Sequence, residues 1–368
     1  MRVETSKKSY NLWVFVITLI LVSIGTIMVF SASGIMADYR YGTAFTFFLK
    51  QLLWVGIGLL SMLIFSAFDY NKLKKIVPVL LIFTVILLVM VLLLGPTIAG
   101  TKRWLKFGPV GFQPSEIAKL TVVFFLAWYV DRRTSKMKNF QDGLIRPFII
   151  ISIIAGLIYL ERDVGVPVLI FLLALVLLFI GGLRKMYIVF AGLIVSPLIF
   201  YAILKEPYRL KRLTAFLNPW ADPQGSGYQL IQSFLAMGSG GLAGKGLGNS
   251  QIKMLFLPEP HTDFIFPIIG EEFGLIGTMA ILLLFFGLFY FGIKIALHAK
   301  NLFGTLLAFG ITIMITLQMI INISVSIGIF PTKGLPLPFI SFGGSSMVVM
   351  LTGIGILLNI GKQLKIKG

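Results

Sequence analysis

The sequence of 368 residues contains no cysteine. Disulfides, thiol catalysis and thiolate metal sites are therefore excluded. Charged residues are also few: they make up 12% of the chain, about half of their share in an average soluble domain. No polar stretch is much longer than the interval Lys205–His261, so the sequence shows no soluble domain.

Apolar residues dominate instead, at 57% of the chain with a mean hydropathy of +0.96. A helix needs about 20 apolar residues to cross a bilayer. Ten apolar segments approach this length: 12–33, 48–67, 76–95, 114–130, 145–160, 165–182, 186–204, 264–293, 303–330 and 341–360. We predict an all-α polytopic membrane protein with about ten transmembrane helices. It forms one integral membrane domain, 1–368, with a large extracytoplasmic loop at about 205–263.

Acidic residues are scarce: 14 stand against 32 Lys and Arg, which gives a net charge of +18. Placing both termini in the cytoplasm puts about 18 of the 32 bases on the inner side, as the positive-inside rule expects. Loop bases near an anionic bilayer surface explain this charge without nucleic acid. Two outer loops, Gly100–Lys119 and Lys205–Arg212, are nevertheless basic. They indicate either an extracytoplasmic site for an anion or ordinary surface salt bridges.

Three further outer stretches have recognisable patterns. Tyr228–Met237 is typical of an amphipathic helix on the membrane surface. Gly238–Gly248 is glycine-rich, without the spacing of a nucleotide phosphate loop, and indicates a mobile lid or a close backbone approach to a lipid headgroup. Pro331–Ser346 cannot continue a helix because of its prolines. Its glycines and serines favour either an anion at the next helix start or a helix-packing face.

The stretch Pro258–Phe266 leads from a polar tip into a long apolar helix. Asp263 therefore lies where water meets the membrane. Glu271 and Glu272 lie deeper, where each charge costs about 2.5–3.5 kcal/mol. They either serve a function or pair with basic groups of neighbouring helices.

These motifs together resemble the SEDS family of shape, elongation, division and sporulation proteins (FtsW, RodA and SpoVE). The resemblance rests on Gly100–Trp104, Gln113–Lys119, Asp163–Gly165, Pro258–Phe266 and Pro331–Ser346, in that order. The Pro331–Gly334 version is most like FtsW. Two departures stand out: Glu161–Pro167 replaces a more usual Gln-Pro-Asp-Leu-Gly-Thr, and Phe342 stands where tyrosine is common.

The resemblance implies a peptidoglycan glycosyltransferase in the cytoplasmic (inner) membrane. It would polymerise lipid II on the outer face and release undecaprenyl diphosphate. It also implies a class B penicillin-binding protein and other division proteins as partners at the division septum. A lipid II flippase and a non-catalytic scaffold of the division machinery are the alternatives.

Roles for individual residues follow from this resemblance. Asp263 is the expected catalytic base. The candidates for substrate binding are Arg103, Trp104, Glu116, Lys119, Arg209, Arg212, Glu259, His261, Lys333, Ser341 and Ser345. The five bases among them suit two diphosphates, and Glu116 lies on the same helix face as Lys119 to position it. Trp104 stacks on a sugar or belongs to an aromatic belt. No ligand cluster requires a cofactor; a divalent cation (Mg²⁺ or Mn²⁺) between Asp263 and a diphosphate stays open.

Overall fold

The computed structural model describes residues 2–98, 100–108, 110–253 and 260–364. Helices dominate these residues, as the sequence predicts. The α-helices are α1 (Arg2–Tyr41), α2 (Thr46–Ala67), α3 (Tyr70–Leu94), α4 (Pro114–Arg133), α5 (Arg146–Leu160), α6 (Gly165–Ile180), α7 (Lys185–Leu204), α8 (Pro207–Leu217), α9 (Tyr228–Gly240), α10 (Ile265–Leu297), α11 (Leu302–Ser326) and α12 (Gly344–Lys362). Short 3-10 helices cover Thr134–Lys136 and Pro219–Ala221, and a π-helix covers Gln141–Ile145.

Each of the ten predicted apolar segments falls on one of these α-helices. In the described part of the chain, eight helices are long and apolar enough to cross a membrane, and α6 is a shorter apolar helix. The eight do not include α4, which carries Glu116 and Lys119 near its start and three charged residues at its end. The polytopic membrane class is thus confirmed, while the count of ten spans stays a prediction.

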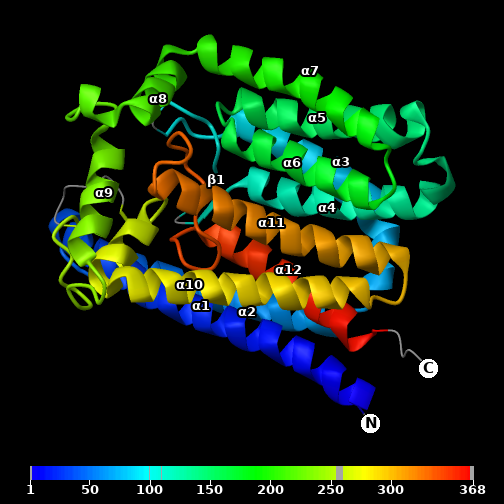
Figure 1. Ribbon diagram of the computed structural model, residues 1–368, viewed down its shortest axis with the longest axis horizontal. Coiled ribbons are helices and arrows are strands. Elements are labelled where there is room, and N and C mark those ends of the chain that lie inside the picture. The colour runs from blue at the N-terminus through cyan, green and yellow to red at the C-terminus, as the bar shows by residue number, and fades with distance from the viewer. Residues whose placement is uncertain (1, 99, 109, 254–259, 365–368) are drawn as a thin grey trace.

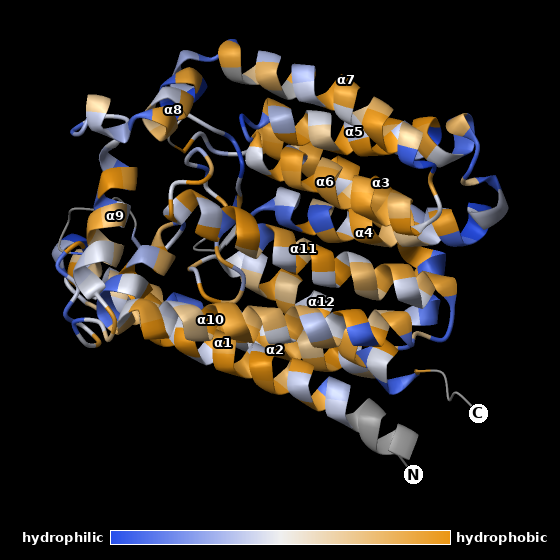
Figure 2. Cartoon of the chain, in the orientation of Figure 1, coloured by the Kyte–Doolittle hydropathy of each residue, from blue (hydrophilic) through white to orange (hydrophobic). Residues whose placement is uncertain are grey.

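The long helices run side by side, and the chain begins and ends at the same end of the bundle (Figure 1). Helices α8 and α9 and strand β1 lie toward the opposite end. The loop between α11 and α12, called the final loop below, lies there as well. Figure 2 shows hydrophobic residues along the bodies of the helices and hydrophilic ones gathered toward their ends. The predicted orientation, with both termini on one side of the membrane, requires this arrangement.

The centre of the bundle is formed by α4, α11 and α12. Small residues let helices approach closely there, as is common in membranes. The Cα of Gly355 in α12 lies against the backbone of Met62 in α2, where an added Cβ would come within 2.4 Å of its carbonyl oxygen. Gly310 in α11 likewise lies against Val123 of α4. By contrast, α7 lies at the rim of the bundle with most of its apolar side chains exposed.

A two-stranded antiparallel hairpin interrupts the otherwise helical chain between α3 and α4. Its strands are β1 (Leu105–Phe107) and β2 (Val110–Phe112), with Leu105 opposite Phe112. The turn includes Gly108 at a φ of +63°, a conformation that glycine adopts without strain. The purely helical prediction missed this hairpin because each strand has only three residues.

The glycine-rich stretch 238–248 supports a break in α10. Gly274 interrupts α10 at φ +64° and ψ −161°. The loop satisfies the backbone groups on both sides of the break: Leu275 N–H donates to the Gly241 carbonyl at 2.9 Å, and Lys245 N–H donates to the Glu271 carbonyl at 2.9 Å. Freed backbone groups at membrane depth need such partners. The loop is therefore held against α10, and the expectation of a mobile lid is wrong for this structure.

The expected amphipathic helix exists as α9, but it packs on another helix. Gly240 in α9 lies against the backbone of α10, since an added Cβ would come within 2.0 Å of the Gly270 carbonyl oxygen. The side chain of Met237 in α9 also lies against Gly270. Thus α9 covers the start of α10, whereas the sequence placed it on the membrane surface.

Candidate active site

Asp263 lies two residues before α10 begins, at the end of the bundle opposite the chain termini. Its carboxylate lies against Gly334 of the final loop, where an added Cβ would come within 2.8 Å of Oδ2. Asn322 of α11 joins the two segments: its Nδ2 donates to the Asp263 carbonyl at 2.8 Å and to the Leu335 carbonyl at 2.7 Å. Asn322 is 1% exposed. Buried amides of this kind fix backbone positions because leaving the carbonyls unpaired is costly.

A second acid, Asp163, lies at the start of α6. One carboxylate oxygen accepts hydrogen bonds from Gly165 N–H at 2.8 Å and Val166 N–H at 3.3 Å, which caps the helix. The other oxygen lies 3.7 Å from Nη1 of Arg103. Nη2 of Arg103 donates to the Arg162 carbonyl at 2.6 Å. The guanidinium of Arg103 is therefore fixed over the turn between α5 and α6.

Three more predicted bases gather near Asp163. Nη1 of Arg212 in α8 donates to the Thr332 carbonyl at 3.0 Å. Nη1 of Arg209 donates to the Tyr159 hydroxyl at 3.2 Å and stacks on the same ring. Burial lowers the pKa of Lys333; Arg209 and Arg212 lower it further, and Asp163 opposes them. This basic group surrounds Asp163, and Lys333 is followed in the chain by Gly334, the residue that lies against the Asp263 carboxylate.

Glu116 and Lys119 form a fully buried ion pair in α4, as their spacing predicts. Nζ of Lys119 lies 2.9 and 2.8 Å from the two Glu116 oxygens and donates to Oε1 of Gln318 at 2.5 Å. Nε2 of Gln318 in turn donates to the Pro336 carbonyl at 2.8 Å. Lys119 is 0% exposed. The structure gives Lys119 a role in holding the final loop, and its contact with a diphosphate stays a prediction.

Two predicted serines support the same loop through their hydroxyl oxygens. Ser341 accepts a hydrogen bond from Leu337 N–H at 2.8 Å, and Ser345 accepts one from Gln113 N–H at 3.0 Å. Trp104 is half-buried and covers Gly111 of the hairpin. Glu259 lies outside the described residues. Contacts of these side chains with a substrate stay predictions.

His261 is buried between two aromatic rings, with centroids 4.3 Å from Phe47 and 5.3 Å from Phe342. Its carbonyl accepts a hydrogen bond from Phe342 N–H at 2.8 Å. Burial, with a smaller effect of Arg40, lowers the pKa of His261 to about 4. At neutral pH the ring is uncharged. His261 therefore joins the segment before α10 to the final loop through its backbone and its apolar contacts.

Glu271 and Glu272 are paired with bases from the outer loop. Nζ of Lys245 lies 2.7 Å from Glu271, and Nζ of Lys253 lies 2.8 Å from Glu272. Ser31 of α1 also donates to Glu272 at 2.7 Å. The predicted pairing is confirmed, but the bases come from the loop after α9 and not from neighbouring helices. Both pairs hold that loop on α10, eight and nine residues after Asp263 in the chain.

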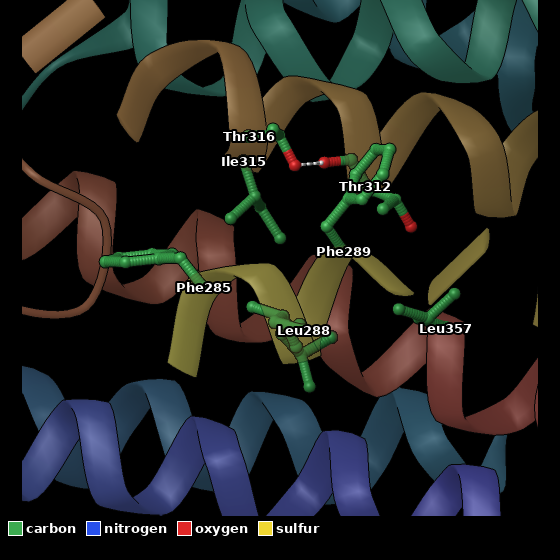
Figure 3. Close-up of a pocket in the computed structure, with 8 residues that line it drawn as sticks. Phe285, Leu288, Phe289, Thr312, Ile315, Thr316 and Leu357 are labelled. Carbon is green, nitrogen blue, oxygen red and sulfur yellow. Dashed lines mark hydrogen bonds between the residues drawn. The ribbon is translucent and has the colours of Figure 1, made fainter. Parts of the chain in front are cut away.

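The space enclosed between α10, α11 and α12 is apolar and offers no alternative site. Figure 3 shows Phe285, Leu288 and Ile315 directed into it. The two threonines at its edge use their hydroxyls within α11, with Thr316 donating to the Thr312 carbonyl at 2.8 Å and Thr312 to that of Ala308 at 2.8 Å. Across the described residues, no three His, Cys, Asp or Glu side chains are grouped to hold a metal.

Sequence reasoning missed two residues that shape this site, Gln318 and Asn322. Asp163 was named only as part of a motif, without a role of its own. Gln318 and Asn322 lie one helical turn apart in an apolar helix, so both face the final loop. Two amides at this spacing within a membrane helix were the available signal.

Comparison with known proteins agrees with the geometry. The family model for FtsW, RodA and SpoVE, described as "Cell cycle protein", matches residues 11–366. The chain is 39% identical over 360 residues to a probable peptidoglycan glycosyltransferase FtsW of Geobacter sp. (strain M18), covering 97% of this chain and 98% of that protein. It is 42% identical over 360 residues to stage V sporulation protein E of Bacillus subtilis (strain 168), with the same coverage.

Solved structures show the same fold. One chain, from a structure described as "Structural coordination of polymerization and crosslinking by a peptidoglycan synthase complex", matches with a TM-score of 0.78 and 26% identity, covering 95% of this chain and 96% of that one. The rod shape determining protein RodA of Thermus thermophilus matches with a TM-score of 0.71 and 24% identity, covering 95% of both chains. The chain belongs to the FtsW/RodA/SpoVE family.

Proposed function

We propose that this protein is a peptidoglycan glycosyltransferase that polymerises lipid II on the outer face of the cytoplasmic membrane, for the septal wall in cell division. One observation carries the proposal: the Asp263 carboxylate lies against Gly334, next to Lys333 and the bases around it. The names of the relatives support the activity: those from Geobacter sp. (strain M18), Geobacter sulfurreducens and Coxiella burnetii are each called a probable peptidoglycan glycosyltransferase FtsW.

The reaction needs a base for a sugar hydroxyl and positive charge for a diphosphate. Asp263 takes the proton of the C4 hydroxyl of the acceptor sugar, while the oxygen of that hydroxyl forms a bond to C1 of the donor sugar. The bond from C1 to the diphosphate oxygen breaks, and its electron pair leaves with the undecaprenyl diphosphate. Arg103, Arg209, Arg212 and Lys333 stabilise the charge that develops there. Arginine contacts phosphate oxygens in pairs, while lysine acts as a point charge.

A divalent cation, Mg²⁺ or Mn²⁺, would bind between Asp263 and the diphosphate of the substrate. Such a cation would supply Lewis-acid stabilisation of the leaving group. In that case EDTA lowers the rate of polymerisation without changing the unfolding of the substrate-free protein. A loss of stability with EDTA would instead indicate a resident metal.

A penicillin-binding transpeptidase is the proposed partner, with other division proteins at the septum. The support comes from the solved complex, whose description joins polymerization and crosslinking. Both termini would be cytoplasmic, which places Asp263 and the basic group at the outer surface. Membrane lipids surround the apolar side chains exposed on the outer helices.

The test is polymerisation of lipid II by the purified protein with its transpeptidase partner, with penicillin present to stop crosslinking. Glycan polymer is resolved on a gel for the wild type, for Asp263→Asn and for the control Asp222→Asn. Asp222 is an exposed acid of the same outer loop, and its carboxylate accepts hydrogen bonds from the N–H and the hydroxyl of nearby Ser226. We expect polymer from the wild type and the control and none from folded Asp263→Asn.

Equal polymer from all three proteins would remove Asp263 from the chemistry. Lipid translocation in liposomes without any polymer would favour the flippase. If neither activity is found, and Asp263→Asn still supports division in cells, the chain is a scaffold.

A further inference from the structure

Glu161 is a buried acid without a partner. It follows α5 directly, at the turn that leads into α6. The residue is 1% exposed, and neither carboxyl oxygen has a hydrogen-bond partner among the described residues. An ionised carboxylate in such a place is costly, and a buried acid of this kind takes up a proton.

The charged groups around Glu161 do not favour its ionisation. Asp163, two residues further on, repels a negative charge on Glu161, while Arg103 attracts it. Arg103 is already engaged: its Nη1 lies 3.7 Å from Asp163, and its Nε donates to the Glu161 carbonyl at 3.4 Å. Burial first, and Asp163 second, raise the pKa of Glu161 to about 8, with Arg103 opposing. Further out, Lys333 faces Asp163 from the final loop.

The turn itself is held in an unusual conformation. Arg162 has a φ of +62°, which is uncommon for a residue other than glycine. Its carbonyl accepts the 2.6 Å hydrogen bond from Arg103. Arg103 thus joins the backbone of the Glu161 turn to the Asp163 carboxylate, so a new charge on Glu161 would act on the one guanidinium that organises this turn.

We propose that Glu161 is a positioning residue that works as a neutral carboxylic acid. Without charge, it leaves Arg103 free to pair with Asp163 and with an anionic substrate. Once ionised, it draws Arg103 toward itself and repels the diphosphate. The part that concerns the diphosphate rests on the proposed function.

The first test does not depend on enzymatic activity. Infrared spectra of the full chain in nanodiscs are recorded between pH 5 and pH 10 for the wild type, Glu161→Gln and the control Asp38→Asn, which removes an exposed acid. We expect a band of a protonated carboxyl group at pH 7 in the wild type and in Asp38→Asn. The band should disappear with a midpoint near pH 8 and be missing in Glu161→Gln. A band that persists in Glu161→Gln, or none in the wild type at pH 7, overturns the inference.

The second test is the pH profile of lipid II polymerisation. The neutral fraction of an acid with a pKa of about 8 falls about tenfold between pH 7 and pH 9. We expect kcat/KM of the wild type to fall with it, mainly through KM, while Glu161→Gln keeps its pH 7 rate within about twofold and loses this decline. A merely structural role would not change the profile, so superimposable profiles overturn the inference. If no protein makes polymer, the proposed function fails, and the infrared result still decides the state of Glu161.

Discussion

Replacing Lys253 should show how much its buried ion pair with Glu272 contributes to the free energy of unfolding. Lys253 and Glu272 form an ion pair at 2.8 Å, with side chains 3% and 0% exposed. Ser31 hydrogen-bonds to both partners, at 3.1 Å from Nζ and 2.7 Å from the carboxylate. Among the described residues, the carboxylate in Lys253→Met keeps only the serine hydroxyl as a hydrogen-bond partner. Breaking a buried pair in this way costs about 3–5 kcal/mol.

The free energy of unfolding can be followed by circular dichroism while SDS is titrated into the protein in mild detergent. The variants are Lys253→Met, the double variant Lys253→Met/Glu272→Gln, and the control Lys300→Met at an exposed lysine. The double variant should recover most of the loss, because it removes the orphaned charge. A cost below about 1 kcal/mol for Lys253→Met, or no recovery in the double variant, would refute the reasoning that the pair is buried and necessary.

Three further outcomes are expected. Gly334→Ala places a methyl group 2.8 Å from the Asp263 carboxylate, so polymerisation should fall at least ~10-fold while helical content is unchanged; an unaffected rate would mean that this contact is not kept during turnover. Asn322→Ala leaves the carbonyls of Asp263 and Leu335 without their donor, which should cost about 1–3 kcal/mol in an unfolding titration, and an unchanged midpoint would contradict this. His261 has a pKa lowered from 6.5 to about 4, so the folded protein binds fewer protons than the unfolded chain between these values and stability falls as the pH drops through them; in His261→Gln that fall should be absent, and an equally steep fall would assign it to other groups.

The positions of the long helices were the part of the fold that the sequence predicted well. Each of the ten apolar segments became a helix because hydrophobic length is a strong signal in a bilayer protein. The hairpin at Leu105–Phe112 is too short to leave a periodic pattern. The glycine-rich stretch was misjudged for a different reason: its partner is the broken helix at Gly274, 26 or more residues away in the chain. Local composition contains no trace of that contact.

Residues of the candidate site could be selected from the sequence, but the distances between them could not be predicted. Asp263 and the bases of three loops were identified because charges at the outer ends of apolar helices are conspicuous. Asn322 and Gln318 hold the segments of the site together. In the sequence both are isolated amides within an apolar helix, so their role is easily overlooked. The sequence also does not show which of these bases are buried. Lys119 is of a residue type that binds phosphate, but it is enclosed by Glu116 and Gln318.

The outer basic residues therefore divide into two groups with different duties. Some pair with buried acids and hold segments in place: Lys119, Lys245 and Lys253. Others are only partly buried and lie around Asp163 and the final loop: Arg103, Arg209, Arg212 and Lys333. Under the proposed function, the second group is better placed than the first to attract a diphosphate, so the net charge of these loops overstates the charge available to a substrate. Neutralising a base of the first group should therefore lower stability before substrate affinity, because it leaves a buried carboxylate without its counter-charge. Neutralising a base of the second group should lower substrate affinity first, because a half-exposed cation loses only its contact with the ligand.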